Sequence, residues 1–464
     1  MARKKGMNNK NRKLKKKYIY FFMEGSKNCS KDKYIKEYYG EFQDKATDIG
    51  FRFISCGDGS WKNIEKEINK EKRIDVLKTS VLFGANASGK SNFIIILKMF
   101  RYYLLVSGKN KFREEAFRFG LEDKKSLIRI RNIINNKIYE YAIELNFKEK
   151  KILKEEMYIE KDRKSLIFTR EKNKIVNYEK KVFSKYKKTI EFLNETLKDS
   201  DSILSRIKEW KMPKEIKEYI NYLEKSIITD KNYDIGKFLY KNKEYKDKVL
   251  KFLDKFGISI GDIIVKREKN VFTFDRLEKS EAFQKLDDNK KEMVLSEIDP
   301  YKYSPIFIYK KSNKTYELSY LEQSEGTRKL LSLFIPIYCL LNQGGVMIID
   351  EIDKTLHYKL VKEIIKTFNS LENKKNAQII FSSHNLLLLD FNLFKKEQIW
   401  FLENNDIFNG TEFYSLSDIE NYKENDYLLR DYLNGNFGGI PNLKEFGENI
   451  WLDEKKGKTT KIKK

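Results

Sequence analysis

The sequence predicts an α/β fold in which a mixed β-sheet is flanked by helices and carries an antiparallel β layer and a helical insertion. An apolar run at residues 80–83 leads directly into a glycine-rich loop and a helix. Two further apolar runs, 345–349 and 378–381, are followed by acidic residues and by a histidine, as expected of buried strands that end at one edge of a sheet. Residues 125–176 alternate in short β-like runs, whereas residues 178–300 are rich in Lys and Glu in a helical pattern.

The glycine-rich loop is a complete phosphate-binding P-loop. Its glycines let successive backbone N–H groups point at phosphates, and the helix that begins near Gly89 adds its positive dipole end. Lys90 reaches the β- and γ-phosphate oxygens, and Ser91 offers a hydroxyl to Mg²⁺. The motif therefore predicts binding of a nucleoside triphosphate. The predicted contacts are Gly84, Asn86, Ser88, Gly89, Lys90, Ser91 and Asn92.

The second half of the predicted site follows the apolar run 345–349. A P-loop sheet holds its metal-positioning acid at the end of a neighbouring strand, and Asp350 and Glu351 stand there. Asp350 would hold the metal through its water shell, and Glu351 would polarise the water that attacks the γ-phosphate. The alternative is an ordinary buried strand with an acidic turn.

A histidine and a serine complete the prediction. His384, one of two histidines in the chain, follows an apolar strand, where a neutral imidazole could bond the γ-phosphate and hold the attacking water. Ser324 has the character of a helix N-cap, and Gly326 leaves the backbone uncovered, so this helix start is a second anion site. One nucleotide needs only one P-loop, so the second site predicts a γ-phosphate presented by another subunit. A core histidine and a plain helix cap are the alternatives.

These motifs, in this order, resemble those of the ABC-type ATPases. Within them the chain is similar to prokaryotic AAA-family ATPases of the RloA-like and OLD-like (overcoming-lysogenization-defect) branch. The resemblance spans residues from about 79 to 102 and 318 to 443. The sequence match is strongest at residues 83–92, 350–357, 382–385, 398–401, 412–418 and 436–441.

The resemblance implies a function as well as a fold. Two heads would close face to face on ATP and Mg²⁺ as a homodimer or higher homo-oligomer, with Ser324 and Gly326 acting in trans. Asp353 and His357 would sit on the dimer-facing loop, and Lys90, Glu351 and His384 would carry hydrolysis. In such families the ATPase regulates a separately encoded effector, here an RloB-like or other Toprim-related nuclease, in anti-phage defence (abortive infection).

Two departures from the family pattern concern Tyr358 and the usual metal-sensing glutamine. Tyr358 stands where a proline is usual, and no glutamine follows Ser91 before the middle region.

The placement of the motifs predicts five segments. The two halves of the head surround an insertion. Heptads do not persist in this insertion, and its helices would be too short for an SMC-type arm. That insertion either receives a partner or is a structural lid. The segments are a basic tail (1–17), a first half with P-loop and β layer (18–176), the helical insertion (177–300), a second half with the signature, acidic strand and His384 (301–453), and a basic tail (454–464).

Charge and cysteine content limit the possible binding partners and the cellular compartment of the protein. The net charge is +25, and residues 1–17 and 455–464 supply nine and six basic side chains without an acid. Such arms are solvated, or contact nucleic acid or an acidic partner, or reflect lysine-rich composition alone. Three cysteines without paired spacing indicate a reducing compartment. With no apolar run long enough for a bilayer and no signal-peptide core, we expect a cytoplasmic protein without membrane contact.

The sequence gives less support to a nuclease activity in the same chain as the ATPase. Both histidines belong to ATPase motifs, so none remains for an HNH or HEPN nuclease or a His-ligated metal. Residues 19–25 resemble the opening strand of a Toprim domain, but too few residues follow before the P-loop for its acidic cluster. Two alternatives stay open: an SMC-like ATP-dependent DNA clamp in repair, and a self-sufficient ATP-dependent nuclease that uses carboxylates.

Overall fold

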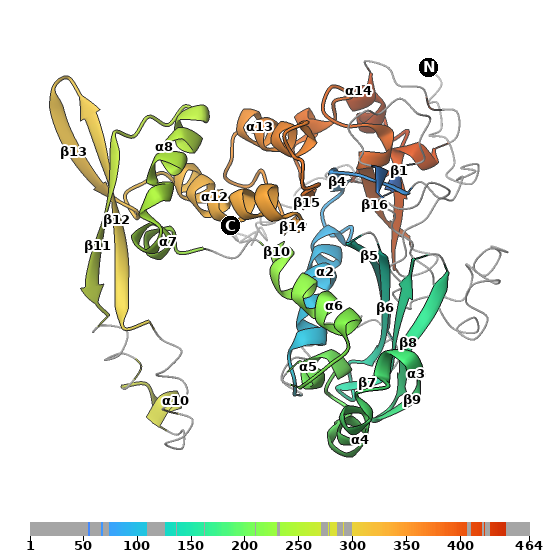
Figure 1. The fold of residues 1–464 in the computed structure, drawn as a ribbon. Coiled ribbons are helices and arrows are strands. Elements are labelled where there is room, and N and C mark those ends of the chain that lie inside the picture. The colour runs from blue at the N-terminus through green and yellow to red at the C-terminus, as the bar shows by residue number, and fades with distance from the viewer. Residues whose placement is uncertain are drawn as a thin grey trace, which may run out of the picture.

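The fold is known from a computed structural model. It describes residues 54–55, 66–67, 74–108, 126–135, 137–161, 163–208, 210–229, 233–270, 277, 279–284, 291, 299–405, 410–419, 422 and 427–441. The basic tails and the segment 19–25 lie outside these residues. The described strands form four sheets, with six, five, three and three strands (Figure 1).

The central sheet is mixed, as the sequence predicts. Five neighbouring strands run parallel, and the edge strand β17 pairs antiparallel with β16. The inner strands are buried on both faces, which explains why they are continuous apolar runs rather than alternating ones. In spatial order the strands are β10 (Ile227–Thr229), β14 (Val346–Ile349), β15 (Gln378–Ser382), β4 (Thr79–Gly84), β16 (Ile399–Asn405) and β17 (Gly410–Ser415).

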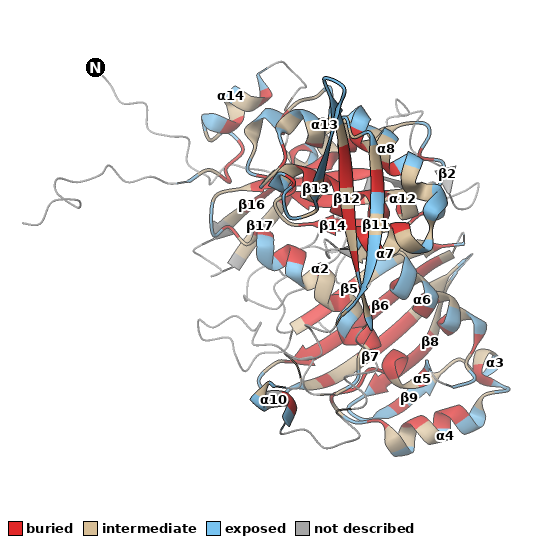
Figure 2. Ribbon diagram, turned by 90° about the vertical axis from the view of Figure 1, so that its left-hand side faces the viewer, coloured by how far each residue is buried: buried red, intermediate tan, exposed pale blue. Residues whose placement is uncertain are grey.

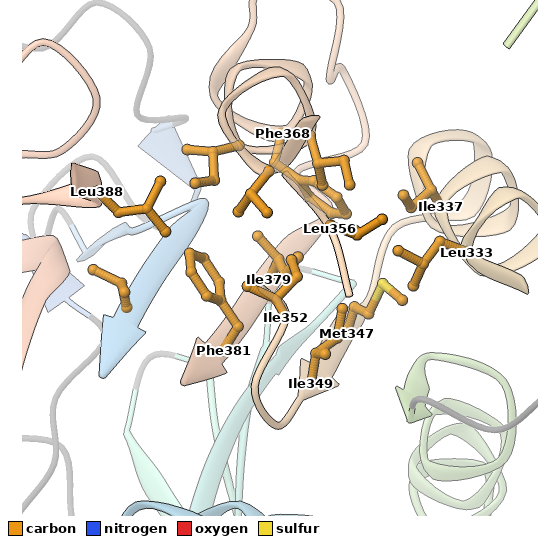
Figure 3. Packing of buried hydrophobic residues seen from close by; sticks show 14 of the residues in the cluster. Leu333, Ile337, Met347, Ile349, Ile352, Leu356, Phe368, Ile379, Phe381 and Leu388 are labelled. Atoms are coloured by element: carbon orange, nitrogen blue, oxygen red, sulfur yellow. The ribbon is translucent and has the colours of Figure 1, made fainter. Parts of the chain in front are cut away.

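Successive residues of these strands point into two different cores. On one face, Leu82, Ile348 and Ile380 pack with helix α2 (Lys90–Leu105) and the five-stranded sheet. The opposite face packs against α12 (Glu325–Gln343) and α13 (Tyr358–Asn369). Figure 3 shows this second core, in which Met347, Ile349, Ile379 and Phe381 lie near Leu333, Ile337, Leu356 and Phe368.

The five-stranded sheet is an antiparallel meander and confirms the predicted β layer. Its strands pair in sequence order, so each needs only a short turn. Its second strand is buried along almost its whole length, whereas its last strand is mostly exposed (Figure 2). The strands are β5 (Ser126–Ile134), β6 (Lys137–Asn146), β7 (Lys151–Glu160), β8 (Lys164–Glu171) and β9 (Lys174–Tyr178).

The segment 177–300 contains helices, as expected, but also two strands that its pattern does not indicate. Three-residue β10 joins the edge of the central sheet beside β14, and β11 (Asp262–Lys269) pairs with β12 (Tyr301–Lys311). Both strands are specified by partners distant in sequence, so local propensity does not predict them. The helices are α3 (Lys180–Phe183), α4 (Lys187–Thr196), α5 (Ile203–Ile207), α6 (Lys214–Lys225), α7 (Ile235–Lys241), α8 (Lys246–Lys255) and α10 (Glu281–Gln284).

The remaining elements are short. Strand β13 (Lys314–Ser319) forms a hairpin with β12 and leads into α12. Strands β1 (Ile54–Ser55), β2 (Lys66–Glu67) and β3 (Ile74–Val76) make a small sheet, and α14 (Leu428–Leu433) lies near the end of the described chain. Among the helices that the structure describes, none has the length and apolarity needed to cross a membrane.

Candidate functional site

The P-loop connects β4 to α2 at the carboxyl edge of the central sheet. Gly89 is the N-cap of α2 with φ +97°, a conformation that L side chains rarely adopt. A Cβ at Gly89 would also lie 2.2 Å from the Thr411 hydroxyl oxygen, and one at Gly84 would lie 2.4 Å from the Leu402 carbonyl oxygen. Neighbouring strands therefore crowd both glycines, and the loop keeps its shape only with glycine at these positions.

Lys90 is folded onto the loop that precedes it. Its Nζ donates hydrogen bonds to the carbonyl oxygens of Gly84 (2.8 Å) and Ala85 (2.9 Å), and the side chain is 5% exposed. Burial lowers the pKa of Lys90 below its usual value, while the charges of Asp350 and Glu351 oppose that shift. The structure thus places the lysine within electrostatic reach of both acids that the sequence assigns to the site.

Some of the other predicted P-loop contacts are exposed to solvent, and one is buried. Asn86, Ser91 and Asn92 are exposed at the loop and at the first turn of α2. Ser88 is 1% exposed, and its Oγ has no hydrogen-bond partner among the described residues. An unpaired buried hydroxyl is costly, so a ligand that accepts or donates a bond at Ser88 would relieve that cost.

A serine on the neighbouring strand organises the two acids. Ser382 ends β15, and its Oγ donates a 2.5 Å hydrogen bond to Asp350 Oδ1 while accepting one of 2.7 Å from the backbone N–H of Glu351. Glu351 has φ +47°, an uncommon conformation for a residue other than glycine. Such backbone persists where surrounding bonds hold it, and here Ser382 supplies one.

The Glu351 carboxylate lies between two cationic or polar groups. Its Oε2 is 3.7 Å from Lys354 Nζ, and its Oε1 is 3.8 Å from His384 Nε2. The backbone N–H of His384 in turn donates to Asp353 Oδ2 at 3.3 Å. The structure therefore brings together five of the predicted site residues: Lys90, Asp350, Glu351, Asp353 and His384.

The predicted signature residues and His357 have hydrogen-bond partners of their own. Ser324 caps α12, where its Oγ accepts from the Thr327 N–H (3.1 Å) and bonds the Thr327 hydroxyl (2.8 Å). Gly326 is close enough to the next motif that a Cβ there would lie 3.1 Å from the Thr355 carbonyl oxygen. His357 caps α13 by accepting from the Lys359 N–H at 3.3 Å. The bonds of both caps stay within their own helices.

Sequence reasoning assigned no role to three residues at this site. Ser382 stands two residues before His384, at the end of the apolar run 378–381, so its position could have suggested a link to Asp350. Thr411 and Gly439 carried no such signal. Gly439 belongs to the 436–441 motif, and a Cβ there would lie 3.6 Å from Gly84 Cα, so the C-terminal motif packs on the start of the P-loop.

The donor atoms at this edge suit a magnesium ion held together with phosphates. Mg²⁺ prefers oxygen ligands and is usually bound by one or two carboxylates plus substrate oxygens. Asp350 offers a carboxylate whose Oδ1 is oriented by Ser382, and Ser91 offers an exposed hydroxyl at the start of α2.

A comparison with protein families finds a match over more than half of the chain. Residues 80–390 match the family described as "AAA domain, putative AbiEii toxin, Type IV TA system". No curated protein matches the chain.

Solved structures with a similar arrangement include heads of SMC proteins. The SMC head domain from Thermotoga maritima is 11% identical, with 86% of this chain and 99% of that chain covered and a TM-score of 0.36. The head bound to the C-winged helix domain of ScpA is 13% identical, with 76% and 95% covered and a TM-score of 0.33. A head with an extended coiled coil, bound to a ScpA domain derived from Pyrococcus furiosus, is 13% identical, with 76% and 94% covered and a TM-score of 0.28.

Proposed function

Because the chain belongs to the AAA-domain family that its residues 80–390 match, we propose that it binds ATP with Mg²⁺ and hydrolyses the γ-phosphate bond. The observation that carries the proposal is the Ser382 bridge. One hydroxyl holds the Asp350 carboxylate and the Glu351 backbone in fixed relation, and both acids lie within electrostatic reach of Lys90. A lysine, an oriented acid and a second acid beside a histidine are the parts that P-loop hydrolysis requires.

Each residue has a distinct part in this proposal. Lys90 exchanges the carbonyl oxygens of its own loop for phosphate oxygens, which are stronger acceptors because they are charged. Asp350 and Ser91 would hold Mg²⁺, which supplies positive charge that neutralises the phosphate oxygens. Glu351 accepts a proton from the attacking water. His384, whose Nε2 lies 3.8 Å from Glu351 Oε1, orients that water.

The second anion site suggests that the pocket is shared between two copies. Ser324 caps the nineteen-residue helix α12, whose uncapped N–H groups form a positive end. Its bonds stay within α12, and Gly326 lies against the loop that follows Glu351. We assign Ser324 and Gly326 to the γ-phosphate of a partner copy, with Asp353 and His357 on the facing loop.

The cellular role follows from the resemblance to RloA-like and OLD-like ATPases. In this proposal ATP-dependent pairing of heads regulates a separately encoded, Toprim-related nuclease in anti-phage defence. Co-expression with the product of the adjacent open reading frame, followed by co-purification, tests it. A nuclease that co-purifies with the wild-type chain and protects cells from phage only when Lys90 is intact would support the role. Protection that persists in Lys90→Ala would contradict it.

Phosphate release tests the hydrolysis itself. Lys90→Ala and Glu351→Gln should each lower turnover by about 10²-fold or more, because each removes a group needed in the transition state. Lys174→Ala, an exposed change on the β8–β9 hairpin, is the matched control and should keep wild-type turnover. Equal turnover in all four proteins would mean that hydrolysis occurs elsewhere or in a contaminant.

A further inference from the structure

The β12–β13 hairpin ends in a basic tip. Lys310, Lys311 and Lys314 are exposed, and residues 310–315 contain no acid. The last residue pair joining β11 to β12 is Asp262 with Ile308, so residues 309–316 extend beyond β11 as a two-stranded ribbon. In Figure 1 the turn between β12 and β13 lies at the upper left, away from the central sheet.

The tip places two like charges directly opposite each other. Lys311 pairs with Lys314 across a turn whose two residues, Ser312 and Asn313, have φ values of +48° and +62°. Like charges at opposed positions of a hairpin destabilise it. Neither lysine has a hydrogen bond or ion pair among the described residues. The fold therefore maintains a local repulsion that an anionic ligand would relieve.

Two other lysine-bearing hairpin tips in the described chain each give one lysine an acidic neighbour. On β8–β9, Glu171 stands opposite Lys174 across the turn. On β6–β7, Lys151 Nζ lies 2.9 Å from the Glu149 carboxylate. At the β12–β13 tip, Lys310 lies within electrostatic reach of Asp262, whereas Lys311 and Lys314 face each other.

Aromatic side chains adjoin the lysine pair on the same face of the ribbon. Tyr309 and Tyr316 form the next cross-strand pair with the same side-chain orientation, because side chains alternate along a strand. Tyr316 is 50% exposed. An exposed aromatic ring beside two lysines suits a ligand with regularly spaced phosphates and planar bases.

The hairpin is bonded to the residue that precedes Ser324. The Tyr309 hydroxyl donates a 2.6 Å hydrogen bond to Gln323 Oε1, and Gln323 Nε2 donates to the Ser319 carbonyl oxygen at 3.3 Å. Gln323 is 5% exposed, so it is held between the two strands of the hairpin and the start of α12. A displacement of the ribbon would thus be transmitted to the Ser324 cap.

We propose that the basic hairpin, residues 309–316, binds nucleic acid, and that its occupancy is relayed to the Ser324 anion site through Tyr309 and Gln323. A two-stranded ribbon has the width that the major groove of a duplex admits, and lysines supply the phosphate contacts. The relay rests on the proposed function, whereas binding to the hairpin does not. Nucleic acid would then be the signal that the ATPase reads.

Fluorescence anisotropy with a short labelled DNA duplex tests the binding surface without ATP. The double variant Lys311→Gln, Lys314→Gln should bind more weakly, and its slope of log affinity against log salt should be shallower by about 2, one for each lost phosphate contact. The matched control is Lys172→Gln, Lys174→Gln at the β8–β9 tip, which should bind as wild type does. All variants keep residues 1–17 and 455–464, so only differences from wild type are compared.

Two results would overturn the binding proposal. One is equal affinity and equal salt slope in the Lys311→Gln, Lys314→Gln variant and in wild type. The other is competition by poly-glutamate at the hairpin without any duplex binding there, which would assign the surface to an acidic protein instead.

Gln323→Leu tests the relay, because it removes both amide bonds to the hairpin and leaves residues 309–316 unchanged. In wild type a non-hydrolysable ATP analogue should change duplex affinity by about 5-fold or more, the usual lower range of coupling between sites. In Gln323→Leu duplex binding without nucleotide should stay at the wild-type level and the change caused by the analogue should disappear. Coupling that survives in Gln323→Leu would contradict the relay. If the analogue itself does not bind, the proposed ATP site fails while the hairpin result stands.

Discussion

Ser382, the last residue of β15, and Asp350, directly after the neighbouring parallel strand β14, are joined by a 2.5 Å hydrogen bond from the serine hydroxyl to the carboxylate. The same hydroxyl accepts the Glu351 N–H, so one side chain aligns the acid proposed for the metal and the acid proposed for the water. The relationship depends on the register in which β14 and β15 pair. It provides a direct way to perturb the site without removing either acid.

Ser382→Ala should reduce ATP turnover while leaving ATP binding nearly intact. The change releases Asp350 and leaves the Glu351 N–H without its acceptor, and a lost bond to a charged group costs about 1.5–3 kcal/mol. Turnover should fall by about 10- to 100-fold. Ser383→Ala, one residue further on, is the control, and phosphate release is the measurement. Wild-type turnover in Ser382→Ala would show that the bridge has no part in hydrolysis.

Glu351→Gln should trap an ATP-bound dimer. The amide keeps the size of the side chain but cannot accept the proton of the attacking water, so hydrolysis should slow by about 10²- to 10⁴-fold. Light scattering with ATP and Mg²⁺ should then give twice the mass of the chain, and the same protein without nucleotide should be a monomer. A monomer under both conditions would refute the shared pocket.

Ser324→Arg should prevent dimerisation without abolishing ATP binding. The large side chain overfills the face assigned to the partner's phosphate, and overpacking costs about 1–3 kcal/mol. Placed in the Glu351→Gln background, it should weaken the dimer by about 5-fold or more, while titration calorimetry still detects nucleotide. Ser184→Arg, an exposed site beside α3, controls for the added charge. A dimer of unchanged stability would remove Ser324 from the interface.

ATP affinity should fall as the pH rises through the Lys90 pKa. Burial lowers that pKa from 10.5 in the nucleotide-free protein, whereas bound phosphates would favour the charged amine and raise it again. Binding should therefore take up protons in the alkaline range, and the affinity should decline there. Calorimetry in two buffers of different ionisation enthalpy measures the uptake. Lys90→Arg should lose it, because arginine stays charged. An affinity that is constant or rises with pH would contradict this assignment.

Much of the central sheet was predictable from residues 80–91 and from two apolar runs. Buried parallel strands have a strong local signal, and a glycine-rich loop between strand and helix constrains the backbone at Gly84 and Gly89. The antiparallel meander β5–β9 was predictable for the same reason, since each strand pairs with its neighbour in sequence.

Features that depend on distant pairing could not be predicted. Strand β10 has three residues, and it pairs with β14 more than a hundred positions later. The proximity of Thr411 to Gly89 and of Gly326 to Thr355 likewise arises from packing between separate segments. Motifs in the sequence are enough to name the candidate site residues, whereas the Ser382 bridge required the register between two strands.

Titration calorimetry of the wild-type chain with ATP and Mg²⁺ tests the central claim most directly. We expect saturable binding of one nucleotide per chain, and no heat beyond dilution with folded Lys90→Ala. The absence of binding to folded wild-type protein, or equal binding to both proteins, would contradict a site built on Lys90, Asp350 and Glu351.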